Sequence, residues 1–267
     1  MIQVRACSGF DELEACIRLQ IETWGYDEAD VIPRRAFLVA QKIGGQVIGA
    51  FDSAISEGKG GSKAEGTESL VGFALSLPGV KTGNGEPKAY LHSHMLAVKE
   101  SYRNKGLGAQ LKREQRREAL SRGIRLMEWT FDPLEIKNAF LNIHRLGATV
   151  SSYREDFYGL SSSRLQGGLP TDRLLAEWQL DSPRVGGILD GHPAVNQIIE
   201  ELILVPASIY AWKASKENRE RALAVQLQNR QKFQQAFLRG LIVLDFSLDA
   251  DGNGVFELGA PTRPELD

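Results

Sequence analysis

An arginine and two glycines stand at a predicted strand-to-helix junction, in the pattern Arg103-x-x-Gly106-x-Gly108. The first N–H groups of a helix have no partner within it and lie at the positive end of the helix dipole, so they attract phosphate. Glycines leave out the Cβ atoms that would hold a pyrophosphate away from these groups. The pattern therefore predicts a phosphate-binding turn. The alternative is an ordinary helix start with solvated basic side chains.

Two other phosphate-binding motifs are excluded by the residues of this segment. A dinucleotide-binding motif needs a third glycine where Leu111 stands, and a P-loop needs Gly-Lys followed by Ser or Thr, which is absent here.

Two histidines and a glutamate are the candidates for proton transfer. His92 and His94 alternate along a predicted strand and therefore share one face, and histidine changes its charge near neutral pH. Glu128 shares a face of a neighbouring predicted strand with Thr130. The alternatives are polar core residues with structural hydrogen bonds. A metal pair at His92 and His94 would lack an evident third ligand.

Alternating strands and helices position these residues. In the first part of the chain, hydrophobic periodicity and turn residues predict strands at residues 2–6, 46–52, 70–77, 89–98 and 126–131. Helices are predicted from Phe10 to Trp24 with Ser8 as N-cap, at 34–39, from Leu107 to Gly123, and at 139–146. Residues 56–69 predict a flexible loop, and 83–85 a turn. On the helix after the phosphate turn, a solvated basic face is predicted, made of Lys112, Arg113, Arg116 and Arg117.

The second half predicts strands at 173–180, 202–206, 241–248 and 255–258, and a helix at 218–239. The stretches RGIRLMEWTFD (122–132) and RGLIVLDFSLD (239–249) align without gaps, which suggests a partial duplication. Residues 249–254 resemble half of a calcium loop, but Ala260 stands where the bidentate glutamate is needed, so a hairpin turn is predicted.

Composition limits the class of protein. Of the 267 residues, 42% are hydrophobic and 25% charged, and the formal net charge is −2, so no general attraction for nucleic acid is expected. Cys7 and Cys16 predict two reduced cysteines in a core rather than a disulfide framework. The first residues, MIQVRACSGF, carry charge where a signal peptide would need an apolar run, and no apolar run approaches about 18 residues, so we expect a cytoplasmic protein that does not contact membranes.

Residues 96–111 closely resemble motif A of the GNAT acyltransferase superfamily, and the order of elements from Ile2 to Tyr158 fits the same family. The stretches HSHMLAV, EWTFDPL, NAFLN, RLGA, LPTDR and WQLDSPRV are similar to those of a bacterial subgroup of predicted acetyltransferases. The resemblance implies an α/β fold with a mixed sheet. It implies a GNAT domain at 1–158 and an extension at 159–267 that adds strands or forms a degenerate second lobe.

The resemblance also implies a coenzyme A site. Backbone groups of the strand would pair with the pantetheine arm, N–H groups of the turn would hold the pyrophosphate, and an N–H near Met95 would polarise the acyl carbonyl. The implied cofactor-binding residues are Leu96, Ala97, Val98, Arg103, Asn104, Lys105, Gly106, Leu107, Gly108, Ala109, Asn138 and Asn142. No metal is implied.

The chain departs from the family at the residue that often protonates the departing thiolate, because Ile143 stands where many members have a tyrosine. Asn142, His144 or Tyr153 are substitutes, or the thiolate leaves unaided. We therefore take His94, Glu128 and Tyr153 as the catalytic candidates, and Trp24 and Tyr26 as candidates for the acceptor pocket.

The expected reaction is transfer of an acetyl group from acetyl-CoA to a primary amine of a small molecule. The alternatives are succinylation of amino acids with succinyl-CoA, a protein lysine or N-terminus as acceptor, and a non-catalytic CoA-binding protein. A homodimer is left open.

Overall fold

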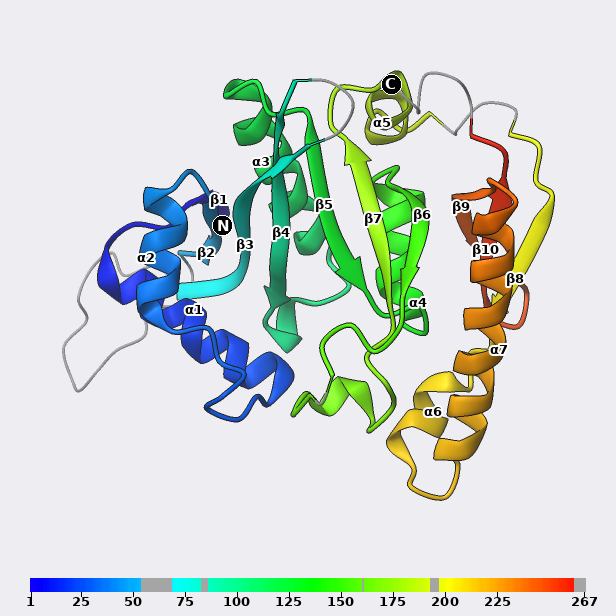
Figure 1. Ribbon diagram of the computed structural model, residues 1–267. Helices are drawn as coiled ribbons and strands as arrows, with labels where there is room; N and C mark the ends of the chain where they lie inside the picture. The colour runs from blue at the N-terminus through cyan, green and yellow to red at the C-terminus, as the bar shows by residue number, and fades with distance from the viewer. Residues whose placement is uncertain (54–68, 83–85, 160, 193–196, 262–267) are drawn as a thin grey trace. The chain divides into compact units, whose positions relative to one another are not determined.

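The computed structural model describes residues 1–53, 69–82, 86–159, 161–192 and 197–261 (Figure 1). The chain divides into two compact units, Met1–Met127 and Glu128–Asp267, each described here by itself. The division falls within strand β5 (Leu126–Phe131). The domain boundary expected near residue 158 stays a prediction.

The first unit contains an antiparallel sheet in the order β1-β2-β3-β4. Its strands are β1 (Ile2–Ala6), β2 (Gln46–Asp52), β3 (Ser69–Lys81) and β4 (Lys88–Val98). The predictions for β1 and β2 are confirmed in full. β3 runs four residues further than predicted because Pro78 to Lys81 pair with the start of β4. The predicted loop at 56–68 and the turn at 83–85 lie outside the described residues, whereas Ser69 belongs to β3.

Helices cover both faces of this sheet, since successive side chains of a strand point to opposite sides. Helices α1 (Gly9–Trp24) and α2 (Arg34–Lys42) share a core with Val47, Phe73 and neighbouring residues. Helix α3 (Leu107–Ser121) shares a second core with Ile48 and Ala74. Cys7 and Cys16 are free and buried, as predicted. α2 continues three residues beyond the predicted end, because the first glycine that can stop it is Gly44.

The inner face of α3 includes Leu107, Leu111, Gln115 and Ala119. The prediction that Lys112 belongs to the solvated basic face is wrong. Its side chain is buried, and its Nζ donates a hydrogen bond to Ser93 Oγ on β4 at 2.7 Å. A long aliphatic stem lets a lysine reach across apolar surface to a polar partner, which a count of charges along a helix cannot reveal.

The second unit has the strand order β5-β7-β6-β9-β10-β8. Besides β5, its strands are β6 (Thr149–Arg154), β7 (Arg173–Gln179), β8 (Glu201–Val205), β9 (Ile242–Leu248) and β10 (Gly254–Gly259). β6 was not predicted, because two serines hide its apolar alternation and a bulge shifts its register against β7 after Val150. The predicted hairpin turn is confirmed: β9 and β10 are antiparallel, and Asp249 Oδ1 accepts from the N–H groups of Asp251 and Asn253.

The helices of the second unit are α4 (Ile136–Ala139), α5 (Pro183–Leu189), α6 (Ile209–Ala214) and α7 (Arg219–Leu238). The helix predicted at 139–146 begins three residues earlier and continues from α4 as a π-helix, Phe140–Arg145. The N–H of Leu146 bonds to the carbonyl of Leu141 at 3.0 Å, as the wider turn requires. Strand β10 lies between β8 and β9 and is antiparallel to both. The partial duplication stays a prediction.

Candidate functional site

The segment between β4 and α3 is held in place before the helix begins. Lys99 N–H bonds to the carbonyl of Val71 at 2.8 Å, which extends the ladder one residue past β4. A short 3-10 helix, Glu100–Tyr102, follows, and the Tyr102 hydroxyl donates to Asp52 Oδ2 on β2 at 2.7 Å. The turn that follows therefore starts from a fixed point.

The turn itself contains two residues with left-handed backbone conformation, Asn104 (φ 60°) and Gly106 (φ 78°). Glycine and asparagine adopt this conformation most readily. Gln110 is the first residue whose N–H bonds to a carbonyl at the start of α3, that of Gly106 at 3.1 Å. Among the described residues, no backbone oxygen accepts from the N–H groups of residues 104–109. Clustered free N–H groups of this kind form an anion-binding concavity.

The turn is open to solvent and carries positive charge. A Cβ added to Gly106 would meet no atom within 4 Å. Arg103 Nε donates to the Val98 carbonyl at 3.0 Å, and Lys105 Nζ to the Ser101 carbonyl at 2.8 Å. Both cations are thus held beside the turn, where they add to the field of the helix dipole.

Leu96, Ala97 and Val98 form the last part of β4, where they pair with Ala74, Phe73 and Gly72 of β3. Ala97 is buried on the side of α1 and α2, while Leu96 and Val98 pack on the side of α3. These residues and the turn therefore form one continuous framework in the first unit. Their predicted contacts with a pantetheine arm stay predictions.

His94 occupies a β-bulge in β4. Leu75 lies opposite Met95 and Ser76 opposite Ser93, so His94 has no residue opposite it on β3. Bulges of this kind redirect a side chain and are frequent next to active sites. The ring centroids of His92 and His94 are 6.1 Å apart, so the two imidazoles are neighbours.

Both imidazoles are shifted towards the neutral form. Burial, with smaller contributions from the charges of His94 and Lys112, lowers the pKa of His92 to about 4. Burial alone lowers the pKa of His94. A neutral imidazole can accept a proton at neutral pH, which is what a general base requires.

The second unit carries the other predicted site residues. Glu128 is buried on β5, Asn142 is buried in the π-helix, and Asn138 is exposed near the end of α4. Ile143 is completely buried. It therefore contributes packing at the position where the resemblance implies a tyrosine. Trp24 and Tyr26, in the first unit, stack with ring centroids 5.5 Å apart and pack against the core of α1 and α2.

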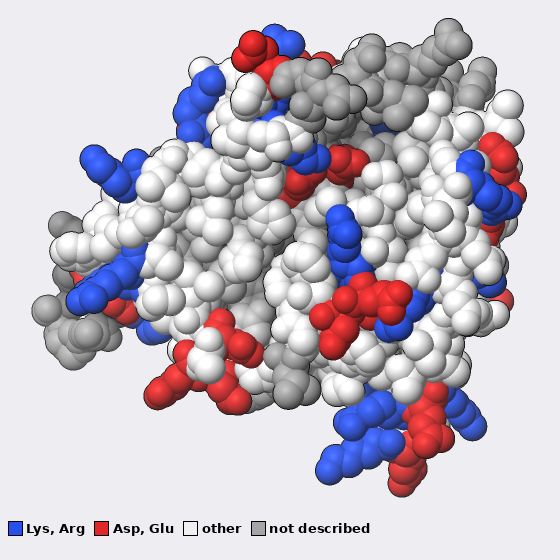
Figure 2. Space-filling view, in the orientation of Figure 1, with Lys and Arg blue, Asp and Glu red and all other residues white. Residues whose placement is uncertain are grey.

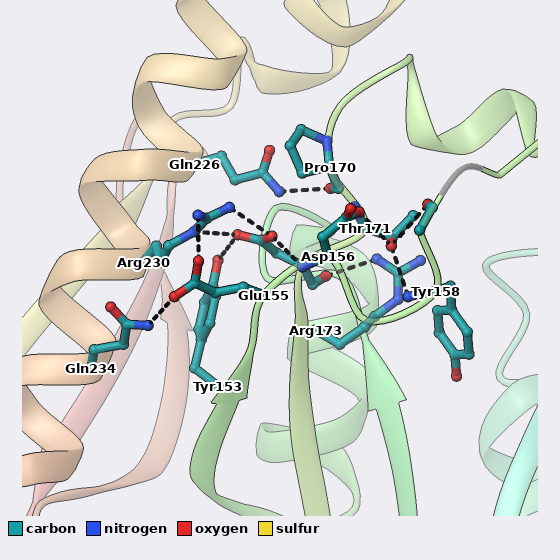
Figure 3. Close-up of polar contacts among 12 residues, drawn as sticks. Tyr153, Glu155, Asp156, Tyr158, Pro170, Thr171, Arg173, Gln226, Arg230 and Gln234 are labelled. Carbon is teal, nitrogen blue, oxygen red and sulfur yellow. Dashed lines mark hydrogen bonds and ion pairs between the residues drawn. The ribbon is translucent and has the colours of Figure 1, made fainter.

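Tyr153 belongs to a polar network between β6, β7 and α7 (Figure 3). Its hydroxyl donates to Asp172 Oδ2, and its ring stacks on Phe233 of α7 with centroids 5.8 Å apart. Burial, followed by the hydrogen bond to Asp172, raises the pKa of Tyr153 well above its usual value. A phenol in this state releases its proton reluctantly.

Arg230 of α7 is the centre of this network. Its Nε and Nη2 bind the two carboxylate oxygens of Asp172, each at 2.9 Å, and its Nη1 binds Glu155 at 2.7 Å. Gln226 Nε2 donates to the Pro170 carbonyl at 2.8 Å (Figure 3). No role was predicted for Asp172 or Arg230 from the sequence. The LPTDR stretch does contain Asp172, but its partner Arg230 lies 58 residues further along the chain, so no local pattern points to the ion pair.

Within the described residues, no three His, Cys, Asp or Glu side chains gather in a way that could hold a metal ion. Acidic and basic side chains are interspersed on the face seen in Figure 2, in keeping with the net charge of −2. No helix among the described residues is long and apolar enough to cross a membrane.

Comparison with protein families gives one assignment. Residues 14–141 match the sequence model of the Acetyltransferase (GNAT) family. The matched segment contains β2, β3, β4, the phosphate turn, α3 and β5. No curated protein matches the chain significantly.

Solved structures are similar to this chain at low sequence identity. A structure of Arabidopsis thaliana NAA60 in complex with acetyl-CoA is 16% identical, covers 67% of this chain and 99% of its own, and has a TM-score of 0.50. The ribosomal-protein-S18-alanine N-acetyltransferase from Escherichia coli is 13% identical over 68% of this chain and 96% of its own, with a TM-score of 0.46. At this identity the similarity to the NAA60 structure concerns the fold alone.

Proposed function

Through residues 14–141 the chain belongs to the Acetyltransferase (GNAT) family and is an acyl-CoA-dependent N-acetyltransferase, and we propose that its acceptor is the primary amine of a small molecule. The acetyl group comes from acetyl-CoA in this proposal. The observation that supports acetyl-CoA as the donor is the turn before α3, where free N–H groups lie beside Arg103 and Lys105.

The N–H groups of Asn104 to Ala109 bind the pyrophosphate of coenzyme A in this proposal. Main-chain donors suit this ligand because a helix N-terminus supplies several of them in a fixed orientation. Leu96 to Val98 extend along the pantetheine arm in this proposal. Asn138 and Asn142 are the other cofactor-binding residues that we propose.

In the reaction, the neutral amine attacks the carbonyl carbon of the thioester, the C–S bond breaks, and an amide forms. The proton lost by the nitrogen goes to His94 or Glu128, and the departing thiolate takes up a proton to leave as the free thiol. His94 is favoured as the base for two reasons. Burial lowers the pKa of its imidazole, so the neutral form that can accept a proton is present at neutral pH. The residue also sits in a β-bulge. An N–H near Met95 stabilises the developing oxyanion.

Tyr153 is the remaining candidate for the proton donor. The described contacts favour a structural role, since its proton is already shared with Asp172. Departure of the thiolate without an acid is compatible with the buried Ile143 at the family's tyrosine position.

One rival deserves a direct test: a protein that binds coenzyme A without catalysis, for which the buried Ile143 is the supporting observation. The experiment mixes the protein with acetyl-CoA or succinyl-CoA and a panel of small amines, amino acids and peptides, and follows the release of free thiol. We expect release with acetyl-CoA and a small amine. Thiol release only with peptides would replace the proposed acceptor, and faster release with succinyl-CoA would replace the proposed donor. Binding of coenzyme A without thiol release across the panel would support the rival.

The phosphate assignment is tested by Gly108→Asp, with Gln110→Asp as a control that adds the same charge on the exposed side of the same helical turn. A side chain at Gly108 blocks the approach of phosphate and repels it. We expect coenzyme A affinity, measured by calorimetry, to fall at least about 100-fold in Gly108→Asp and less than about tenfold in the control. Equal affinities for Gly108→Asp and the wild type would contradict the assignment.

A further inference from the structure

Helix α6 places a buried lysine against the segment that joins β5 to α4. Lys213 Nζ donates to Asp132 Oδ2 and to Glu135 Oε1, each at 2.8 Å. The lysine side chain is only 5% exposed, and the two carboxylates are 11% and 20% exposed. One ammonium group therefore joins two carboxylates that are three residues apart in the chain.

The same two carboxylate residues shape the backbone of this segment. Asp132 Oδ1 accepts from the N–H of Leu134 at 2.8 Å, and the Asp132 carbonyl accepts from the N–H of Glu135 at 3.1 Å. Glu135 in turn is the N-cap residue of α4, and its carbonyl accepts from the N–H of Ala139 at 2.9 Å. Lys213 thus fixes both ends of the turn from which α4 starts.

A second contact from α6 supports the first. The Tyr210 hydroxyl accepts a hydrogen bond from the N–H of Lys137, in the first turn of α4, at 3.2 Å. That N–H would otherwise have no partner, because the first N–H groups of a helix find none within it. Residues 210 and 213 lie one turn apart on α6, so one face of this short helix meets the start of α4.

Burying these three charged groups has a large desolvation penalty, so the arrangement contributes little to stability and we look for another role. Removing an ammonium and two carboxylates from water offsets much of their mutual attraction, so a buried ion pair is a weak source of stability. Burial disfavours the charged amine, yet Asp132 and Glu135 outweigh it and raise the pKa of Lys213. The contacts do impose a definite geometry. If Lys213 moved away from Asp132 and Glu135, a charged group would be left buried without its partner.

We propose that Lys213 is a positioning residue for acyl-CoA binding: from α6 it fixes the start of α4, and with it Asn138 and Asn142, in the conformation that receives the cofactor. The inference rests on the proposed function, in which these asparagines contact coenzyme A. It gives the region after residue 158 a part in cofactor binding although it supplies none of the predicted cofactor contacts.

The test compares Lys213→Met with Lys216→Met, an exposed lysine three residues further along the chain and beyond the end of α6. Coenzyme A binding is measured by calorimetry, and KM for acetyl-CoA and for the acceptor by steady-state kinetics. We expect Lys213→Met to raise the Kd of coenzyme A and the KM of acetyl-CoA at least about tenfold, with the KM of the acceptor changed less than about twofold. Lys213→Arg should recover most of the affinity, because it keeps the charge. Lys216→Met should behave as wild type.

A folded Lys213→Met protein that binds coenzyme A with wild-type affinity overturns the inference, even if its melting temperature is lower. If Lys213→Met does not fold, Glu135→Gln takes its place, because it weakens one of the two contacts and leaves the other. An unchanged Kd in Glu135→Gln then counts against the inference, and a raised Kd supports it. A wild-type protein that binds no coenzyme A refutes the proposed function itself, so the two failures are distinguishable.

Discussion

The hydroxyl of Tyr153 lies 2.5 Å from Oδ2 of Asp172, a completely buried carboxylate that also accepts a two-pronged contact from Arg230. The phenol and the guanidinium share one carboxylate, and each keeps the other in place. The end of β6, the start of β7 and α7 are joined at this point. Tyr153 is thereby engaged in holding the second unit together.

Tyr153→Phe separates a structural from a catalytic role. The substitution keeps the ring on Phe233 and removes the hydrogen bond to Asp172, which retains Arg230 as a partner. We expect a loss of about 1–2 kcal/mol in the free energy of unfolding and a kcat within about threefold of the wild type, because a phenol with a raised pKa is a poor acid. Denaturant unfolding and steady-state kinetics measure the two. A kcat reduced 100-fold at unchanged stability would identify Tyr153 as the proton donor after all.

His94→Gln tests the base. A base must be deprotonated to act, so kcat/KM falls as pH falls through its pKa, and a lowered pKa moves that limb to pH values below those of an ordinary histidine. We expect kcat/KM of the variant to fall by roughly 100-fold or more, with the acidic limb lost. Glu128→Gln is the comparison. If the His94→Gln profile overlays that of the wild type while Glu128→Gln loses the limb, the base is Glu128.

His92 makes stability depend on pH. Folding lowers its pKa from 6.5 to about 4, so between these values the unfolded chain binds more protons than the folded one. The free energy of unfolding therefore falls as pH falls, by about 2 kcal/mol between pH 7 and pH 5 from this residue. Urea unfolding at both pH values should show a smaller difference for His92→Gln than for the wild type. A substitution of the exposed His192 controls for the loss of an imidazole, and an unchanged pH difference in His92→Gln would contradict the burial argument.

Gly106 tests the conformation of the turn independently of charge. Its φ of 78° is accessible to asparagine and strained for valine. No atom would meet an added Cβ, so the penalty is conformational rather than steric. We expect Gly106→Val to weaken coenzyme A binding at least about tenfold and Gly106→Asn less than about threefold. Equal losses in the two variants would show that the side chain, and not the backbone angle, determines binding.

Much of the fold was predictable from the sequence because local patterns determine it. The strands β1 and β2 and the turn at Gly106 follow from alternation and glycine placement, which are properties of neighbouring residues. The wrong or missing predictions concern residues whose structure depends on contacts with residues far away in the chain. Lys112 is buried because Ser93 lies beneath it, and β6 forms because β7 pairs with it through a bulge.

The candidate site divides in the same way. The glycine turn before α3 is a local motif, so its position and left-handed backbone can be predicted from the sequence, while phosphate binding there stays a prediction. The contacts of Lys213 and Arg230 reach back 81 and 58 residues, to Asp132 and Asp172. No spacing rule connects positions so far apart. Proton transfer remains the part that sequence described least, since the shifted pKa values of His92 and His94 come from burial in the folded chain.

The turn before α3 presents main-chain N–H groups, and every amino acid except proline carries the same donor. Substitutions in this turn are therefore limited mainly by the left-handed backbone of Asn104 and Gly106, while side chains at other positions can change without loss of the N–H donors. In the proposed function, recognition of the acyl donor therefore depends little on which side chains the turn carries. The acceptor depends on side chains, so descendants of one ancestor can keep the donor and exchange the acceptor, and a shared turn does not predict a shared substrate.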